Sequence, residues 1–220
     1  MLLIGVLVAP FAVPYLEARR DNPCFQRDIT ELYSYSADVT DFLVAPRHSL
    51  VWGAATGPVR PDPYTRGNEA ERSLFTGLLP LLLSTGGIAF LWSRRSARDH
   101  IVLWFYGLLL ISSAVLCLGV TFYAFGRHAA IWMPYRILYY AFPGFRAIRT
   151  PARIFVLVVL SLSVLTGFGV KWLRERLGRR LDPSMVTAIV VLVLLLVSLE
   201  GMPGGVPASS LPLKKDFPPP

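Results

Sequence analysis

The chain has 220 residues, of which 54% are hydrophobic and only 16% are charged, and its mean hydropathy is +0.51. A soluble domain carries about a quarter charged residues, so this composition excludes an ordinary soluble domain and indicates a membrane protein. The 22 basic residues outnumber the 14 acidic ones. Because the arginines lie between apolar runs, we expect membrane lipid to be the partner and not nucleic acid.

Five apolar stretches predict an all-α transmembrane fold of about five membrane-spanning helices, with residues 1–220 forming a single transmembrane region. A bilayer core needs about 20 mostly apolar residues per helix. The predicted spans are residues 1–16, 73–92, 101–125, 152–170 and 185–202. The last of them reaches residue 202 only if Glu200 lies at the membrane interface.

The opening stretch of residues 1–16 is short for a span and contains Pro10 and Pro14. No basic segment precedes it and no small-residue cleavage site follows it, which disfavours a signal peptide. We therefore expect it to be the end of a longer helix. Together with the proline-rich tail at residues 203–220, it suggests a fragment of a larger membrane protein.

Residues 17–72 form a loop that is too long for a turn and too polar to cross a membrane. Within it, DITELYSYSADVTDFL predicts one or two short surface helices, with Ser36 as an N-cap and Pro46 as a stop signal. Such a loop can contact a ligand or simply face solvent. Its candidate contact residues are Glu17, Arg20, Tyr35, Asp38 and Asp41.

The density of basic residues in the short loops predicts the orientation. Residues 93–100 contain three arginines, and residues 171–184 contain five basic residues. Basic loops stay in the cytoplasm. We therefore expect a multi-pass protein of the inner (cytoplasmic) membrane, with its N-terminus on the cytoplasmic side. The loops 17–72 and 126–151 and the tail at 203–220 are then expected outside.

The loop at residues 126–151 is apolar enough to lie on the membrane. Its stretch from Ile131 to Phe142 is too short to cross, so it predicts a re-entrant or interfacial helix. Arg127, His128 and Arg136 would then face the lipid headgroups. His128 is also a candidate contact for a ligand, although an interfacial histidine is the commoner case.

Three arginines gather where the fourth span begins. Thr150-Pro151 has the pattern of an N-cap followed by proline at the first helical position, and Arg146, Arg149 and Arg153 lie around it. Cations oppose the positive end of the helix dipole, and a bound anion would remove that conflict. We expect a lipid phosphate there, with simple anchoring to headgroups as the alternative.

Other chemistry has little support in the sequence. There is no glycine-rich phosphate loop, no GxSxG and no HExxH pattern. The two cysteines, Cys24 and Cys117, fit no disulfide framework and no metal pattern. No catalytic residue and no cofactor is identified, and a divalent metal on an outer carboxylate stays an open alternative.

Several short motifs resemble the later part of large bacterial polytopic proteins of the GT-C glycosyltransferase type. They are Tyr35-Ser36-Ala37-Asp38, Leu74-Phe75-Thr76-Gly77 with threonine where proline is usual, and the Arg149, Pro151 and Arg153 pattern. The resemblance implies transfer of a polyprenyl-phosphate-linked sugar on the outer face of the membrane. The catalytic acid of such enzymes usually lies in a first outer loop, which nothing here matches. The alternative is a non-catalytic lipid-binding or transport-associated membrane subunit.

Overall fold

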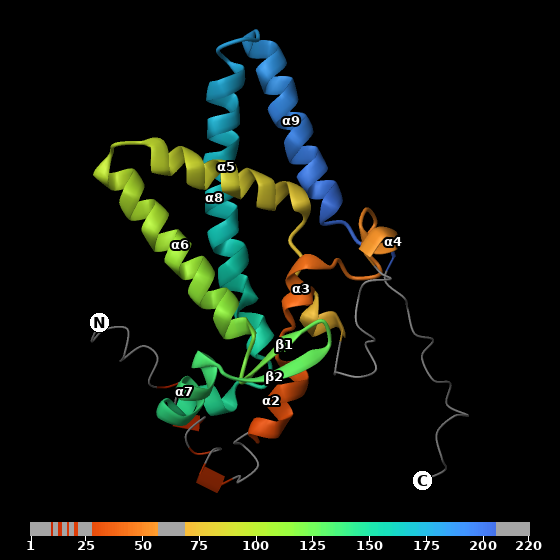
Figure 1. Ribbon diagram of the computed structural model, residues 1–220, viewed down its shortest axis with the longest axis vertical. Coiled ribbons are helices and arrows are strands. Elements are labelled where there is room, and N and C mark those ends of the chain that lie inside the picture. The colour runs from red at the N-terminus through yellow and green to blue at the C-terminus, as the bar shows by residue number, and fades with distance from the viewer. Residues whose placement is uncertain are drawn as a thin grey trace.

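The computed structural model describes residues 28–56 and 69–205, together with the isolated positions 10, 13, 14, 17, 20 and 21. Within this part the chain is mostly helical, and three of its helices are long and apolar enough to cross a membrane (Figure 1). Most of the predicted first span, 1–16, and most of the tail at 203–220 lie outside the described residues.

The three long helices correspond to three of the predicted spans. They are α6 (Ala97–Cys117), α8 (Phe155–Leu177), which the 3-10 turn η6 (Pro151–Ile154) precedes, and α9 (Pro183–Glu200). At about 1.5 Å per residue, the 21 residues of α6 are long enough for a bilayer core of about 30 Å. The prediction for 101–125 was wrong at its end, because α6 stops at Cys117, and the fourth span continues past residue 170 to Leu177.

The stretch predicted to span at 73–92 forms α5 (Leu78–Ser93), a helix of 16 residues that is shorter than a usual span. It crosses α8 steeply (Figure 1). At the crossing, a Cβ atom on Gly87 would lie 2.0 Å from the Leu165 carbonyl oxygen, and one on Gly169 would lie 1.9 Å from that of Leu83. Only glycine permits this approach of the two backbones, as is common between membrane helices.

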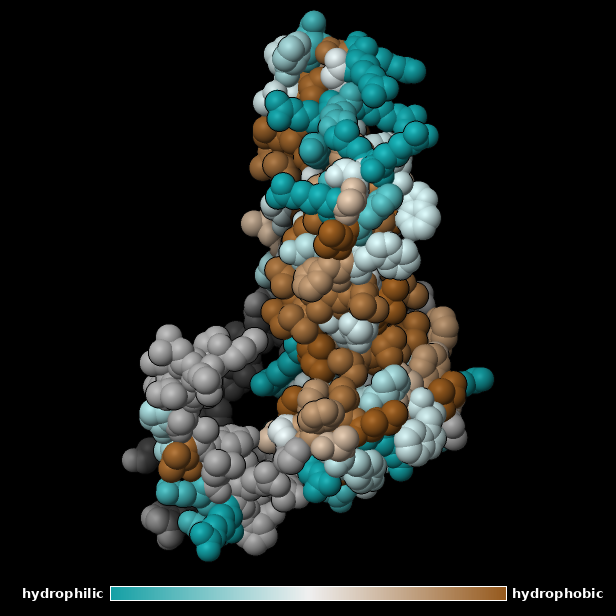
Figure 2. Space-filling model, turned by 90° about the vertical axis from the view of Figure 1, so that its left-hand side faces the viewer, coloured by the Kyte–Doolittle hydropathy of each residue, from teal (hydrophilic) through white to brown (hydrophobic). Residues whose placement is uncertain are grey.

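The outer surfaces of the long helices are apolar. Trp104, Leu108 and Ile111 of α6 are largely exposed, as are Val156 and Leu160 of α8. Figure 2 shows an apolar band around the middle of the molecule, with hydrophilic side chains gathered at the end where α8 turns into α9. Such a band would be unfavourable in water, so it supports a membrane location.

A β-hairpin follows α6, so the described chain is not entirely α-helical. Strand β1 (Thr121–Ala124) pairs antiparallel with β2 (Arg127–Trp132), and Ala124 lies opposite Arg127. The two turn residues, Phe125 and Gly126, have φ angles of 53° and 76°. Two positive φ angles are typical of a tight turn that matches the twist of a hairpin.

Short helices lie at the same end of the molecule as the hairpin, and we call this end the cap end. They are α2 (Ile29–Tyr35), α3 (Val39–Leu43), α4 (Gly53–Thr56), η4 (Glu69–Arg72), α7 (Pro134–Ala141) and η5 (Pro143–Ala147). The short helices predicted in 17–72 are therefore present in its described part. Ser36 is not the N-cap of the second one, however, because it ends α2 and Asp38 caps α3.

The stretch from Ile131 to Phe142 is not a single interfacial helix. Ile131 and Trp132 belong to β2, and only eight residues form α7. Tyr135 and Tyr139 of α7 are buried against Leu32 and Val120, so this helix packs on the cap end. The predicted helix is thus shorter than expected, and its re-entrant or interfacial position stays a prediction.

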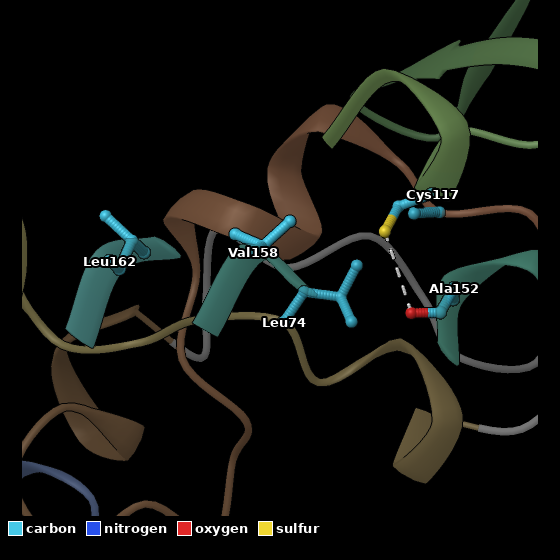
Figure 3. Packing of buried hydrophobic residues seen from close by; sticks show 6 residues of the cluster. Leu74, Cys117, Ala152, Val158 and Leu162 are labelled. Atoms are coloured by element: carbon cyan, nitrogen blue, oxygen red, sulfur yellow. Dashed lines mark hydrogen bonds between the residues drawn. The ribbon is translucent and has the colours of Figure 1, made fainter. Parts of the chain in front are cut away.

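A small apolar core joins the cap end to the spans. Figure 3 shows Leu74, Cys117, Ala152, Val158 and Leu162 packed together, with the Cys117 thiol donating to the Ala152 carbonyl oxygen at 3.8 Å. These residues come from the segment before α5, the end of α6 and the start of η6–α8. The core therefore fixes where α8 begins.

A second link to the cap end is the Glu200 carboxylate, at the end of α9. It accepts hydrogen bonds from the Trp52 indole N–H at 3.0 Å and from the Leu79 backbone N–H at 2.9 Å. Gly77, just before α5, has a φ of 98°, and a Cβ there would lie 2.6 Å from Glu200 Oε2. Glu200 thus joins the segment that contains Trp52 to the start of α5 and the end of α9.

Candidate lipid-phosphate site

Helix α8, with the turn η6 before it, begins where the sequence predicted the start of a membrane-spanning helix. Pro151 opens η6, which continues directly into α8, and Thr150 stands in the N-cap position. The Thr150 hydroxyl does not cap the helix, however. It is buried and donates to Glu71 Oε2 at 2.8 Å. Glu71 lies in η4, so this bond ties η4 to the start of the span.

Arg153 also binds Glu71. Its Nη2 lies 2.7 Å from Glu71 Oε1, and the Arg153 side chain is still 73% exposed. The hydrogen bond from Thr150 is the largest cause that lowers the pKa of Glu71; burial opposes it, and the hydrogen bond and charge of Arg153 together with the charge of Arg149 lower the pKa further. Glu71 is therefore ionised at neutral pH and offsets the positive end of the helix dipole.

Arg149 is held by two residues of α2. Its Nε lies 2.9 Å from Glu31 Oε1, its Nη2 donates to the Tyr35 hydroxyl, and its guanidinium lies 4.6 Å from the centre of the Tyr35 ring. The Arg149 side chain is 53% exposed. Tyr35, predicted as an outer-loop contact, thus orients an arginine of the candidate site.

Arg146 has a different role. Its Nε donates to the Tyr139 carbonyl oxygen at 3.2 Å, and its Nη2 donates to that of Tyr140 at 3.5 Å. These carbonyls are at the end of α7, where basic side chains often complete the hydrogen bonding of a helix. Of the three predicted arginines, the structure therefore brings Arg149 and Arg153 together and directs Arg146 to α7.

Arg149 and Arg153 line one open hollow of about 720 Å³. Glu71 and Thr150 complete its polar side, and the other lining residues are aliphatic: Ala147, Ile148, Ile154, Val156 and Leu157. Val156 lies on the exposed surface of α8, so the apolar side of the hollow continues onto the surface that would face lipid. The hollow therefore has the shape and polarity to accept an amphiphile.

Carboxylates of the chain itself already oppose the charge of Arg149 and Arg153. The arginines were expected to leave a conflict with the helix dipole that a bound anion would remove. The structure places the Glu71 and Glu31 carboxylates on these arginines, so the chain itself supplies the opposing charge. An external phosphate would have to compete with these carboxylates.

Asp38 and Asp41, also predicted as outer-loop contacts, are buried in structural roles. Asp38 is 1% exposed and accepts hydrogen bonds from the backbone N–H groups of Phe125 at 3.0 Å and Gly126 at 2.8 Å. It also caps α3 by accepting from the Thr40 N–H. Asp41 lies 3.4 Å from Arg72 and accepts from the Asp38 N–H. Neither carboxylate faces the hollow.

The other predicted residues lie elsewhere. Glu17 and Arg20 are exposed, and His128 lies on β2 opposite Tyr123. His128 lines a separate hollow of about 510 Å³ together with Trp132 and Arg136. The sequence marked Thr150 only as an N-cap and did not connect Glu31 or Glu71 with the arginines, because no local spacing relates residues that are 79 to 118 positions apart.

In the described part of the chain, no group of three or more His, Cys, Asp or Glu side chains could hold a metal ion. No protein-family model, curated protein or solved structure matches this chain.

Proposed function

We propose that this chain is a multi-pass membrane protein that binds the phosphate group of a lipid in the hollow at the start of α8. One observation carries this proposal. Two exposed arginines stand on one side of a hollow whose other side is aliphatic and continues onto the surface of a membrane-spanning helix. A phosphate would meet the arginines, and an apolar chain would pass along Val156 and Leu157 into the bilayer.

The arginines have unused capacity for a phosphate. A guanidinium carries five N–H donors, and two of them can bind a phosphate in parallel. Arg153 donates to Glu71 through Nη2 and is mostly exposed. In the absence of lipid, Glu71 and Glu31 keep the two guanidinium groups in position. A phosphate then gains its contacts by displacing or sharing the Glu71 contact.

The resemblance to GT-C glycosyltransferases gives this lipid a more specific identity. In that interpretation the ligand is a polyprenyl-phosphate-linked sugar, and this chain holds its lipid phosphate on the outer face of the inner membrane. The second candidate is a non-catalytic lipid-binding or transport-associated subunit. Asp38 and Asp41 are buried and engaged in the fold, so neither offers a free carboxylate to a ligand in the hollow.

The relative positions of the loops support the proposed orientation. The two basic loops predicted to be cytoplasmic lie at the same end of the helices, where Arg94 and Glu175 are 3.4 Å apart. The start of α8, whose residues line the hollow, lies at the opposite end of the helices (Figure 1). If basic loops stay inside, the hollow faces outward. An impermeant thiol reagent should therefore label F125C, but not S96C, in intact cells, with the native cysteines replaced.

The binding test uses the full chain in detergent and polyprenyl phosphate, with the phosphate-free polyprenol as the comparison. The double variant R149Q/R153Q should bind polyprenyl phosphate roughly tenfold or more weakly, since hydrogen bonds between charged groups are lost. R127Q is the matched control, because Arg127 is an exposed arginine of the cap end outside the hollow. E71Q should bind more tightly, because it removes the competing carboxylate.

The outcomes separate the alternatives. Equal binding by wild type and R149Q/R153Q, or equal binding of polyprenol, would reject the phosphate site. A loss of thermal stability without a loss of binding would show that the arginines only hold the cap end together. Transfer of sugar from a polyprenyl-phosphate donor by membranes containing this chain would support the enzyme, and binding without transfer would support the subunit.

A further inference from the structure

A second hollow lies at the end of the molecule opposite the cap end, and we call this end the basic end. The hollow lies between the last turns of α5 and α8. We propose that it binds the headgroup of an anionic phospholipid. Its volume is about 310 Å³, at the lower limit of roughly 300–1,000 Å³ for small-ligand sites. This site shares no residue with the hollow at the start of α8, so it does not depend on the proposed function.

The close crossing of α5 and α8 builds this hollow. Gly87 and Gly169 bring the two backbones together, and the Trp172 ring packs on Gly86, where a Cβ would lie 3.3 Å from Cε3 of the indole. Beyond this contact the two helices end, and the side chains of their last turns surround the hollow. Its polar lining consists of Ser93, Arg94, Glu175, Arg176 and Arg179.

The charge of the lining selects an anion. Arg94, Arg176 and Arg179 carry three positive charges, and Glu175 carries the one negative charge of the lining, so the net charge is 3 − 1 = +2. Arg94 lies 3.4 Å from Glu175, and both side chains are little more than 40% exposed. Cations are also favourable at the C-terminal ends of helices. A headgroup with two phosphates would balance this charge.

Aromatic rings hold two of these arginines in position. The Arg94 guanidinium lies 4.7 Å from the centre of the Phe90 ring, and that of Arg176 lies 5.3 Å from the centre of the Trp172 ring. Contacts of this kind restrict the planar guanidinium groups while leaving N–H donors at their edges. The arginines are thus oriented before a phosphate arrives.

The hollow lies at the level expected for lipid headgroups. Trp92 and Trp104 are each 66% exposed at this end of the helices, with ring centres 6.3 Å apart. Exposed tryptophans mark the boundary between the hydrocarbon core and the headgroups. Figure 2 shows the hydrophilic side chains gathered beyond the apolar band at this end. A phospholipid of the adjacent leaflet can therefore place its phosphates among the arginines while its chains remain in the bilayer.

The test measures lipid binding to the full chain by native mass spectrometry in a zwitterionic detergent. The probes are cardiolipin with two phosphates, phosphatidylglycerol with one, phosphatidylcholine with no net charge, and inorganic phosphate. Wild type should bind cardiolipin most tightly and phosphatidylcholine least. R176Q/R179Q should weaken cardiolipin binding by roughly tenfold or more, since the charge-assisted hydrogen bonds of the two lining arginines to the phosphates are lost.

R95Q/R180Q is the matched control, because it removes the same charge from exposed positions of the same end but outside the hollow. It should change cardiolipin binding by less than about threefold. Equal weakening by the two double variants would overturn the proposal, since attraction would then come from the basic end as a whole. Unchanged binding in R176Q/R179Q, or displacement of cardiolipin by millimolar inorganic phosphate, would also overturn it.

Discussion

The two ends of the helices are both rich in arginine, but the arginines have different surroundings. At the cap end, Arg72, Arg149 and Arg153 each face a carboxylate from a distant part of the chain: Asp41, Glu31 and Glu71. At the basic end, the ion pair that the structure describes joins Arg94 to Glu175, and Arg176 and Arg179 surround a hollow with excess positive charge. The density of arginines alone therefore does not identify an anion site. Whether carboxylates of the chain already pair with the arginines must also be considered.

The difference has a physical consequence for each end. Exposed ion pairs contribute little to stability, so the pairs of Arg149 and Arg153 chiefly align α2 and η4 with the start of α8. At the basic end, fewer carboxylates oppose the arginines, and external anions meet less competition. Accordingly, we expect anions to bind more readily at the basic end, and cap-end binding to require displacement of a carboxylate.

The largest expected effect on stability comes from a change at the crossing of α5 and α8. G169A places a Cβ within 1.9 Å of the Leu83 carbonyl oxygen, so α5 and α8 must move apart. We expect a loss of about 3 kcal/mol in the free energy of unfolding, as for severe overpacking. Unfolding in mixed micelles of increasing SDS content measures it.

G167A is the control on the same helix, because nothing lies within 4 Å of a Cβ at that position. It should leave stability unchanged or slightly raised. G169A should also weaken cardiolipin binding at the basic end, since the hollow there depends on the crossing. If G167A and G169A have the same stability, the close approach of α5 and α8 is wrong.

An intermediate effect is expected at the cap end alone. D38A removes the acceptor for the hairpin turn and for the start of α3, and leaves N–H groups without partners. We expect a loss of about 2 kcal/mol, measured by the same unfolding experiment. D28A removes an exposed N-cap with a single 3.3 Å bond and should cost less than half as much.

The effect of D38A should be confined to the cap end. D38A should release the hairpin, which faster proteolysis near Phe125 would report, while cardiolipin binding at the basic end stays the same. Equal effects of D28A and D38A on stability would contradict the anchoring role of the Asp38 carboxylate.

The smallest effect is a pH dependence from Glu71. The folded-state pKa of Glu71 lies below its ordinary value of 4.5, so its stabilising contribution is present above about pH 4.5 and is lost as the pH falls through the lowered folded value. The thermal midpoint of wild type should therefore fall more than that of E71Q between about pH 6 and pH 3.5. Parallel curves for the two proteins would show that Glu71 does not hold the start of α8.

The sequence predicted the three long apolar helices α6, α8 and α9, because length and apolar composition determine them, and Thr150-Pro151 located the start of η6 and α8. The predicted span at 73–92 is the shorter helix α5, so the five predicted spans are not all present as span-length helices in the described residues. Long uninterrupted apolar runs have few alternatives in a bilayer, where every backbone polar group needs an internal partner.

The cap end was not predictable to the same degree. The run at 101–125 is uncharged to its end and gives no sign that Thr121–Ala124 leaves the helix to form a strand. The turn residues Phe125 and Gly126 lack the usual Asn-Gly pattern, and Asp38, 87 residues earlier, supplies part of what holds them. The partners of Arg149 and Arg153 are likewise set by tertiary structure, which local periodicity does not report.

The Glu200 carboxylate has a consequence for the order in which the protein is assembled. The start of α5 has no side-chain cap of its own, and the acceptor for the Leu79 N–H is 121 residues further along the chain. The ribosome makes α5 long before it makes residue 200. The Leu79 N–H at the start of α5 therefore gains this acceptor only after α9 has been made.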